Sequence, residues 1–306
     1  MSIQREIYDE TLRQQHFILA RAYGLSDQTL EDLESHHTEL VALLAGLIAA
    51  YFPKGFSKAT AGQKQAFFAA HRTGVEGIVL PVFSGVLPRV EGAATEMSRY
   101  MENGYAGILK KPLPKSFNAQ EWAQGSMIAD YGLSEWAQKQ ATTATERITR
   151  AGRDVLNSPN VPDISRATGR AIQATLPGLE DMNEAFLMNG ADAIRQAIFP
   201  ECAWRYTAIL DGRTCGTCAH DHGRLFKADQ KRPGLPRHVR CRCAYTPVIV
   251  AGDTGFDEPA TYQDWLMGQM ETNPAFVARM LSPARIDLLA KGKASMEKMV
   301  VDIRKK

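Results

Sequence analysis

The feature that most constrains this chain is a close group of cysteines and one histidine near its C-terminal end. In order they are Cys215, Cys218, His238, Cys241 and Cys243. A C-x2-C turn directs two thiolates at one ion, and a loop that brings round a second pair of ligands completes a tetrahedron. Five candidates for four positions leave one spare, and the spacing does not say which. His220 and His222 lie nearer the first pair and are weaker alternatives.

The segment around these residues needs such a site. From Trp204 to Val250 the chain is rich in glycine, proline and arginine and poor in large apolar side chains. A module of about fifty residues buries too little apolar surface to be stable alone, and small domains compensate with metals or disulfides. We therefore predict one structural zinc ion, whose binding can contribute roughly 10 to 16 kcal/mol. A catalytic zinc with an open coordination position and thiols without metal are alternatives.

Length and composition exclude several classes of protein. The chain has 306 residues, 44% hydrophobic and 23% charged, so we expect two or three folded domains rather than disorder. The longest apolar run, Val41 to Tyr51, is too short to cross a bilayer, and no membrane span is predicted. The first residues lack a secretory signal, so we expect a reducing cytoplasm, where clustered cysteines more often bind metal than form disulfides. Cys202 is expected to be a small buried residue.

Most of the first two hundred residues show helical periodicity. We predict a helical hairpin in which Gly24 closes one helix and Ser26 caps the next, which ends at Pro53. Its leucine-rich stripe is either core or a contact with a partner. Further helices are predicted over residues 61–83, 98–109, 119–156 and 165–198, the last with a break at Pro177 and Gly178.

The C-terminal part has a different character. The runs WRYTAIL and AYTPVIV predict strands, TYQDWLMGQM predicts a helix, and residues 284–290 predict another. The segment NSPNVPD, residues 157–163, is a linker or sharp turn. The predicted fold class is mainly α, with a small α+β zinc-knuckle-type module near the C-terminus. The predicted domains are a helical N-terminal region (1–160), a helical connector (161–203) and the cysteine module with its helical tail (204–306).

The cysteine module is locally basic. It carries nine basic residues, namely Arg205, Arg213, Arg224, Lys227, Lys231, Arg232, Arg237, Arg240 and Arg242. Only three acidic residues oppose them, Asp211, Asp221 and Asp229. These cations either neutralise the thiolates and cover the surface, or contact packaged DNA or an acidic portal surface through phosphate-type contacts without sequence specificity.

Several uncommon residues in this segment occur in a recognisable order. They are Trp204, Leu210, Asp211, Thr214, Cys215, Cys218, Gly223, Pro236, His238, Cys241, Arg242 and Cys243. In this order they resemble the phage Mu F-like head-morphogenesis, or minor capsid, family over about a third of the chain. The tail residues Trp265, Leu266, Arg285 and Gly292 fit the helical extension of that family. Departures are Arg237, where proline or an apolar residue is common, and Ser282-Pro283, where glycine is usual.

The resemblance implies a low-copy, non-enzymatic virion protein of the capsid interior or portal vertex, assembled in the host cytoplasm and needed for head morphogenesis. It implies portal and major capsid proteins as partners. The sequence-independent contact with packaged DNA is expected from the basic residues of the module. The leucine-rich helical faces are then candidate docking surfaces.

Two other interpretations remain. The string AHDHGR resembles part of an HNH nuclease motif, with Asp221 and His222 as candidates for single-metal chemistry. The segment from Trp204 to Thr272 contains no asparagine, however, which such a site normally uses. The other interpretation is a zinc-dependent nucleic-acid-binding protein that contacts DNA through Arg237, Arg240 and Arg242.

Overall fold

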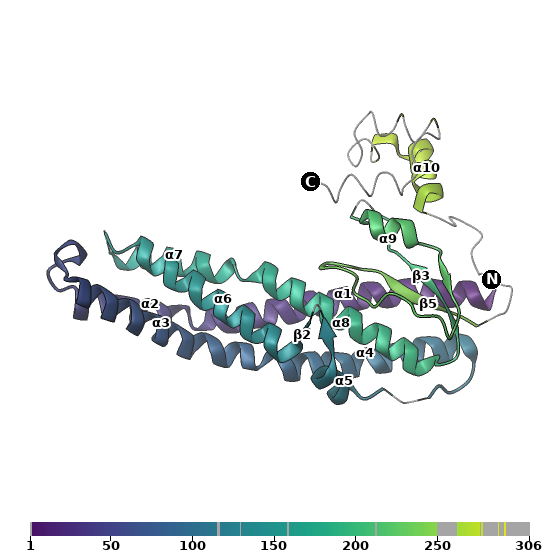
Figure 1. Cartoon of the computed structure of the whole chain (residues 1–306), viewed down its shortest axis with the longest axis horizontal. Coiled ribbons are helices and arrows are strands. Elements are labelled where there is room, and N and C mark those ends of the chain that lie inside the picture. The colour runs from purple at the N-terminus through teal and green to yellow at the C-terminus, as the bar shows by residue number, and fades with distance from the viewer. Residues whose placement is uncertain are drawn as a thin grey trace. The chain divides into compact units, whose positions relative to one another are not determined.

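Figure 1 shows the computed structural model of the chain. It describes residues 2–114, 117–128, 130–157, 159–211, 213–249 and 262–275, together with 277, 287 and 291. Helices take up 71% of the structure and strands 6%, which confirms a mainly α fold with a small sheet near the C-terminus. The contacts divide the chain into two compact units. The sheet unit comprises Met1–Phe17, Met97–Phe117 and Ala191–Lys306, and the helical unit comprises Ile18–Glu96 and Asn118–Gly190.

The elements follow one another with short connections. The helices are α1 (Ile3–Ser35), α2 (His37–Tyr51), α3 (Ala61–Ser84), α4 (Val86–Leu109), α5 (Ala119–Gly125), α6 (Leu133–Asp154), α7 (Val161–Gln173), α8 (Leu176–Ile198), α9 (Gly216–Asp221) and α10 (Tyr262–Thr272), with a short 3-10 turn, η1 (Phe56–Lys58). The strands are β1 (Met127–Ile128), β2 (Tyr131–Gly132), β3 (Ala203–Thr207), β4 (Leu225–Phe226) and β5 (Ala244–Val248).

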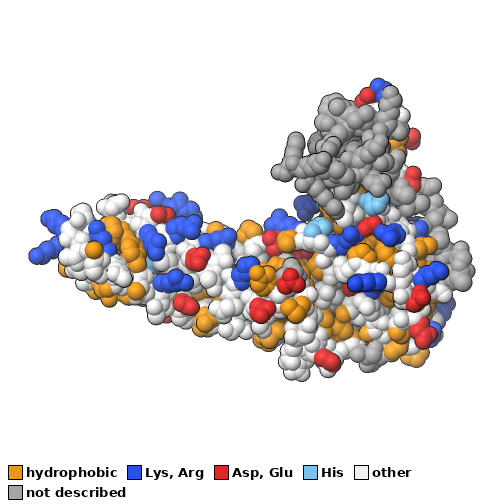
Figure 2. Space-filling view, viewed as in Figure 1, with side chains coloured by type: hydrophobic (Ala, Val, Ile, Leu, Met, Phe, Trp, Pro, Cys, Tyr) orange, Lys and Arg blue, Asp and Glu red, His pale blue; other side chains and the backbone are white. Residues whose placement is uncertain are grey.

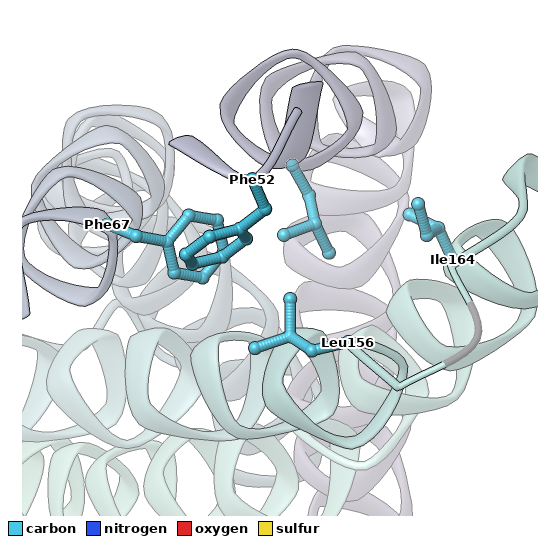
Figure 3. Close-up of a cluster of buried hydrophobic side chains, with 5 residues drawn as sticks. Phe52, Phe67, Leu156 and Ile164 are labelled. Carbon is cyan, nitrogen blue, oxygen red and sulfur yellow. The ribbon is translucent and has the colours of Figure 1, made fainter. Parts of the chain in front are cut away.

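Four helices of the helical unit form a closed bundle. α2 contacts α3 and α7, and α6 contacts the same two helices from the opposite side (Figure 1). At the end of this bundle where the α2–α3 and α6–α7 turns meet, Phe52 and Phe67 pack with Leu156 and Ile164 (Figure 3). Because both turns contribute side chains to one buried cluster, burial of apolar surface holds the two helical hairpins together.

Local signals explain where these helices begin. Thr60 and Gln63 form a reciprocal capping box at the start of α3. At the start of α7, Asn160 accepts a hydrogen bond from the backbone N–H of Asp163 at 2.9 Å, and Pro162 lies in the first turn. Of the segment predicted as a linker or sharp turn, Val161–Asp163 thus form the first turn of α7.

The predicted helix break at Gly24 and Ser26 is wrong, because α1 continues through both residues to Ser35. Ser26 is fully buried, donates to the carbonyl of Ala22 at 2.9 Å and accepts from Asn183 Nδ2 at 3.0 Å. A serine that bonds back to the preceding turn is compatible with a helix interior. Tertiary contact with α8 thus overrides the local capping signal.

The predicted single helix over residues 119–156 is also interrupted. α5 ends at Gly125, and the two-residue strands β1 and β2 pair antiparallel before α6 begins. Asp130 in this hairpin has a positive φ of 67°, a conformation that aspartate adopts more readily than most residues. Glu135 then accepts a hydrogen bond from the N–H of Gly132 at 3.0 Å, which fixes the start of α6.

Part of the leucine-rich stripe predicted as core or partner contact belongs to the core. Leu30, Leu33, Leu40 and Leu44 are at most 7% exposed. The protein's own fold covers these four side chains, whereas Leu43, Leu47 and Tyr51 of the same stripe are half-buried. The docking role that the resemblance implies stays a prediction.

The contact-based division does not follow the boundaries predicted at residues 160 and 203. Within the sheet unit the first turn of α1 packs on β5: Gln4 Nε2 donates to the carbonyl of Pro247 at 2.8 Å, and Gln4 Oε1 accepts from the N–H of Ile249 at 2.9 Å. Gln4 is fully buried. The start of the chain therefore completes the edge of the cysteine module.

One stretch among the described residues, Ala61–Leu109 in α3 and α4, is long and apolar enough to cross a membrane by length and composition alone. The mean hydropathy of its most apolar window is 1.2, and 39% of that window is buried. Core helices of soluble proteins satisfy the same criterion, and α3 packs against α2 and α6. The absence of a membrane span stays a prediction.

The bundle contains a histidine whose burial makes stability depend on pH. His71 is 1% exposed and stacks on Phe67, and burial, reinforced by the charge of Arg153, lowers its pKa to about 4. Because the unfolded chain binds this proton near pH 6.5, the stabilisation is complete above that value and is lost as pH falls toward 4. We expect the free energy of unfolding to fall by about 2 kcal/mol between pH 7 and 5 from this residue.

Urea unfolding of wild type and His71→Leu across this range measures the effect. The matched control is His16→Leu, at an exposed histidine, and His71→Leu should show a flatter pH profile than this control. Equal slopes for wild type and His71→Leu would contradict the assignment.

Candidate metal centre

The cysteine module is built on a three-stranded antiparallel sheet of order β4-β3-β5. Tyr206 of β3 lies opposite Tyr245 of β5, and their rings meet edge to face at 5.4 Å between centroids. Phe226 of β4 packs on Tyr245 in the same way at 5.7 Å. The strands predicted from WRYTAIL and AYTPVIV are confirmed as β3 and β5, whereas β4 has only two residues and gives no periodic signal.

The C-x2-C pair lies at the start of the short helix α9. Cys215 is its N-cap, and its Sγ accepts from the backbone N–H of Cys218 at 3.4 Å. Thr214 bonds to the carbonyl of Ile209, and Asp211 Oδ1 accepts from the N–H of Arg213 at 2.8 Å. These bonds make the loop after β3 a fixed turn, so both sulfurs point to the same side.

The second group lies on the loop that leads into β5. The N–H of Cys241 bonds to the carbonyl of His238 at 3.1 Å, in a tight turn where Arg240 has a positive φ of 60°. His238 Nδ1 lies 2.7 Å from the carbonyl of Val239. A carbonyl only accepts, so Nδ1 carries the proton, and the free electron pair of the neutral ring is on Nε2.

The five predicted residues form two neighbouring triads of ligand atoms that share Cys218. Nε2 of His238 lies 3.0 Å from Sγ of Cys215 and 3.3 Å from Sγ of Cys218, and Sγ of Cys218 lies 3.9 Å from Sγ of Cys241. Within each of two triads all ligand atoms lie within 4.8 Å of one another: Cys215, Cys218 and His238; and Cys218, Cys241 and Cys243. Two sulfurs of a tetrahedral site with metal–sulfur bonds of about 2.3 Å are about 3.8 Å apart. This cluster can hold a metal ion.

A small cavity lies among these side chains. Its volume is about 10 Å³, and Cys215, Cys218, His238 and Cys243 are among the residues that line it. That is about the space of one small atom or ion. The volume of the cavity and the set of donor atoms therefore both fit one bound ion.

The protonation equilibria show why such a cluster needs a cation. Hydrogen bonds from Cys218 and His238 lower the pKa of Cys215 to about 4, whereas the same contact raises the pKa of Cys218. Hydrogen bonds with Cys215 and Cys241 raise the pKa of His238 to about 11. Thiolates this close compete for the available protons, and a bound cation would let them all stay deprotonated.

Tyr206 reaches the cluster from the sheet. Its hydroxyl donates to Sγ of Cys218 at 3.1 Å. Burial, and then the negative charge on Cys243, Cys241 and Cys218, raises the pKa of Tyr206, so it remains a hydrogen-bond donor. Hydrogen bonds of this kind orient a metal ligand and stabilise its charged form.

Two ion pairs hold the loops around the cluster. Asp211 and Arg242 form a bidentate pair with both N–O distances at 2.7 Å. Burial alone would raise the pKa of Asp211, but its hydrogen bonds, chiefly from Arg242, lower it. Asp221 is 5% exposed and is paired with Arg237, with Arg224 at 3.5 Å. Each pair joins the first loop or α9 to a later part of the module.

These contacts also give the nuclease-like residues a structural role. Asp221 is neutralised by the arginines above, and His222 is buried and accepts from the backbone N–H of Ala208 at 3.0 Å through Nδ1. Neither belongs to the two triads found among the described residues. The Asp-His string is thus explained by packing of the loops that surround the metal centre.

The basic residues of the module fall into two groups. Arg205, Arg232, Arg237 and Arg242 are buried or half-buried and bind groups of the module or of α8. Arg232, for example, pairs with the buried Asp192 at 3.0 Å and lies over the ring of Tyr245 at 4.0 Å. Arg237 and Arg242, predicted as DNA contacts, are therefore committed to ion pairs inside the protein. The exposed cations of the module are Arg213, Arg224, Lys227, Lys231 and Arg240.

Other predictions in this region have mixed outcomes. The helix predicted from TYQDWLMGQM is α10, whereas residues 284–290 lie outside the described residues except Asp287. Cys202 is half-buried rather than fully buried. It lines a separate cavity together with Phe199 and Ile249.

No protein-family model matches the chain, and no curated protein or solved structure matches it. Function therefore has to be inferred from the residues themselves.

We expect Cys218→Ser to abolish metal binding, because Cys218 is the residue shared by both triads. Elemental analysis of the purified protein measures this loss. Cys202→Ser, at the cysteine outside the cluster, is the matched control and should keep the metal. Full metal content in Cys218→Ser would contradict the proposed centre.

The same measurement distinguishes the four ligands from the spare residue. Comparison of His238→Ala, Cys241→Ser and Cys243→Ser should show two variants that lose the ion and one that keeps it. Retention in His238→Ala would assign an all-cysteine centre, and retention in either cysteine variant would assign a three-cysteine, one-histidine centre.

Tyr206→Phe removes the hydroxyl that donates to Cys218 and leaves the ring in place. We expect about tenfold weaker metal affinity with unchanged stoichiometry, measured by competition with a chromogenic chelator. Tyr245→Phe is the control, since the Tyr245 hydroxyl donates instead to the carbonyl of Pro233 at 2.8 Å. Equal affinities for the two variants would mean that the Tyr206 hydrogen bond does not stabilise the thiolate.

Proposed function

We propose that this chain is a non-enzymatic phage minor capsid protein that acts in head morphogenesis at the portal vertex or capsid interior. The observation that supports this proposal best is that the residues of the resemblance work together in one module. Trp204 lies beneath Arg232 at 4.7 Å, Asp211 binds Arg242 and Thr214, and the cysteines and His238 meet. An accidental match in the sequence would not be expected to yield such a connected set.

The metal we propose is a single structural zinc ion. Thiolates with imidazole in a tetrahedral arrangement are the donors that zinc prefers in proteins. The module has only three short strands and a six-residue helix, so its own apolar core is small. A centre with four protein ligands leaves no open position for substrate, which agrees with a structural rather than a catalytic ion.

The proposed partners are the portal protein and the major capsid protein. Because four leucines of the stripe are buried in the core, we propose that such contacts use other surfaces of the chain as well. Exposed apolar side chains in the described residues include Met127 and Tyr131 of the β1–β2 hairpin, at 61% and 41% exposure, and Val239 beside His238, at 51%.

Quantitative mass spectrometry of purified phage particles tests the proposal. The chain is counted against the portal protein in full particles and in particles emptied of DNA. We expect a few copies per portal in full particles, and loss on emptying would further assign an ejected protein. Absence from both kinds of particle would contradict a virion role.

A control separates packaging from contamination. Particles carrying Cys218→Ser should contain less of the chain if the metal centre supports its fold, while Cys202→Ser should be packaged normally. Equal amounts of the two variants in particles would mean that the metal centre is not needed for incorporation.

A further inference from the structure

The helical unit carries a concentration of positive charge that is independent of the cysteine module. From Leu40 to Val75 the sequence contains no aspartate or glutamate. Its basic residues are Lys54, Lys58, Lys64 and Arg72. Lys54 and Lys58 are exposed and flank η1 in the α2–α3 turn. This turn meets the α6–α7 turn at the apolar cluster of Figure 3, so both turns lie at the same end of the bundle.

A groove between α6 and α7 adds four arginines. Its volume is about 560 Å³, and its walls include Arg147 and Arg150 of α6 and Arg166 and Arg170 of α7. On each helix the arginines are three or four positions apart, so they project from the same face at intervals of about 5–6 Å. We call this cavity the arginine groove. Figure 2 shows Lys and Arg side chains gathered over this part of the helical unit.

The charge of the groove continues onto α3. A second cavity of about 320 Å³ is lined by Arg72 of α3 together with Arg150, Arg153 and one acidic residue, Glu146, of α6. Arg150 therefore belongs to both cavities. The result is a basic surface that extends across α3, α6 and α7, wider than one small anion would occupy.

Carboxylates offset only part of this charge. Arg166 pairs with Asp163 at 3.3 Å, Asp154 also lines the groove, and Glu146 lines the second cavity. Arg150 and Arg170 are exposed and form no ion pair with any other described residue. Two exposed guanidinium groups on opposite walls of a groove are available to bind an external anion, and their forked geometry suits phosphate.

The form of the surface favours a phosphodiester backbone. A row of cations across several helices matches the repeating charge of a nucleic acid, which releases counterions when basic side chains neutralise it. The aromatic rings at this end are covered: Lys64 lies over Phe56 at 4.5 Å, and Arg153 lies over Phe68 at 4.7 Å. Bases therefore lack an exposed ring to stack on among the described residues here, which favours backbone contact with a duplex over single-strand binding.

We propose that the arginine groove and the adjoining surface of α3 bind the phosphate backbone of double-stranded DNA without sequence preference. This site is separate from the metal centre and does not require the proposed capsid role. Arg150 and Arg170 lie at its centre, and the lysines of the α2–α3 turn extend it.

Fluorescence anisotropy with a labelled duplex of about 30 base pairs tests the proposal on the purified full-length chain. Titrations between about 50 and 200 mM salt give the slope of log affinity against log salt. We expect Arg150→Ala/Arg170→Ala to weaken binding about tenfold or more at low salt and to reduce the slope by about 2. The matched control, Arg213→Ala/Lys227→Ala, removes the same charge from the cysteine module and should bind as wild type does.

Further variants distinguish the loss of charge from the loss of folding, and a competitor distinguishes a DNA partner from a protein partner. Arg150→Lys/Arg170→Lys should keep most of the affinity, and circular dichroism should give all variants the wild-type helix content. The proposal is overturned if wild type does not bind the duplex, if the lysine variant loses as much as the alanine variant, or if only the control loses affinity. Polyglutamate that competes as well as DNA per unit charge would assign an acidic protein partner instead. None of these results bears on the particle count, which tests the capsid role separately.

Discussion

The meeting of four thiols and one imidazole in two triads that share Cys218 organises the cysteine module. The loop after β3, the short helix α9 and the loop before β5 each contribute to it. The rest of the module supports this convergence: Tyr206 donates to Cys218 from the sheet, and two aspartate–arginine pairs join the loops. A bound cation would convert mutual repulsion of thiolates into the strongest interaction in the module.

The arginines of the module follow from the same constraint. Sequence composition suggests a nucleic-acid surface, because nine cations face three carboxylates. Arg237 and Arg242 nevertheless bind Asp221 and Asp211, and Arg232 lies between two aromatic rings and a buried aspartate. A count of charges treats every side chain as exposed, whereas a small module uses its long cations to cover apolar rings and tie loops together. The net charge of a segment therefore overstates the positive charge that is exposed and available to a partner.

How much of the fold and of the candidate site the sequence predicts depends on how far apart in the chain the interacting residues lie. The spacing of the cysteines and His238 predicts their convergence because the chemistry of one ion links them, and periodicity predicts most of the helices. Gly24 and Ser26 mislead because their local preferences are overridden by a buried bond to Asn183, which is 157 residues away. The packing of Gln4 against β5 joins opposite ends of the chain and leaves no local signal. The arginine groove arises only when α6 and α7 pack side by side.

The way in which folding brings charges together explains why the cysteine module and the helical unit differ in what they can bind. In the cysteine module folding brings arginines together with carboxylates that lie 16, 31 and 40 residues away in the sequence, and these pairs neutralise much of the charge. In the helical unit a stretch of α2 and α3 lacks carboxylates altogether, and the bundle places it beside arginines of α6 and α7. Folding there concentrates like charges, which repel one another at a cost in stability. A fold that retains such repulsion with only a few carboxylates nearby is more easily explained by an external polyanion than by packing.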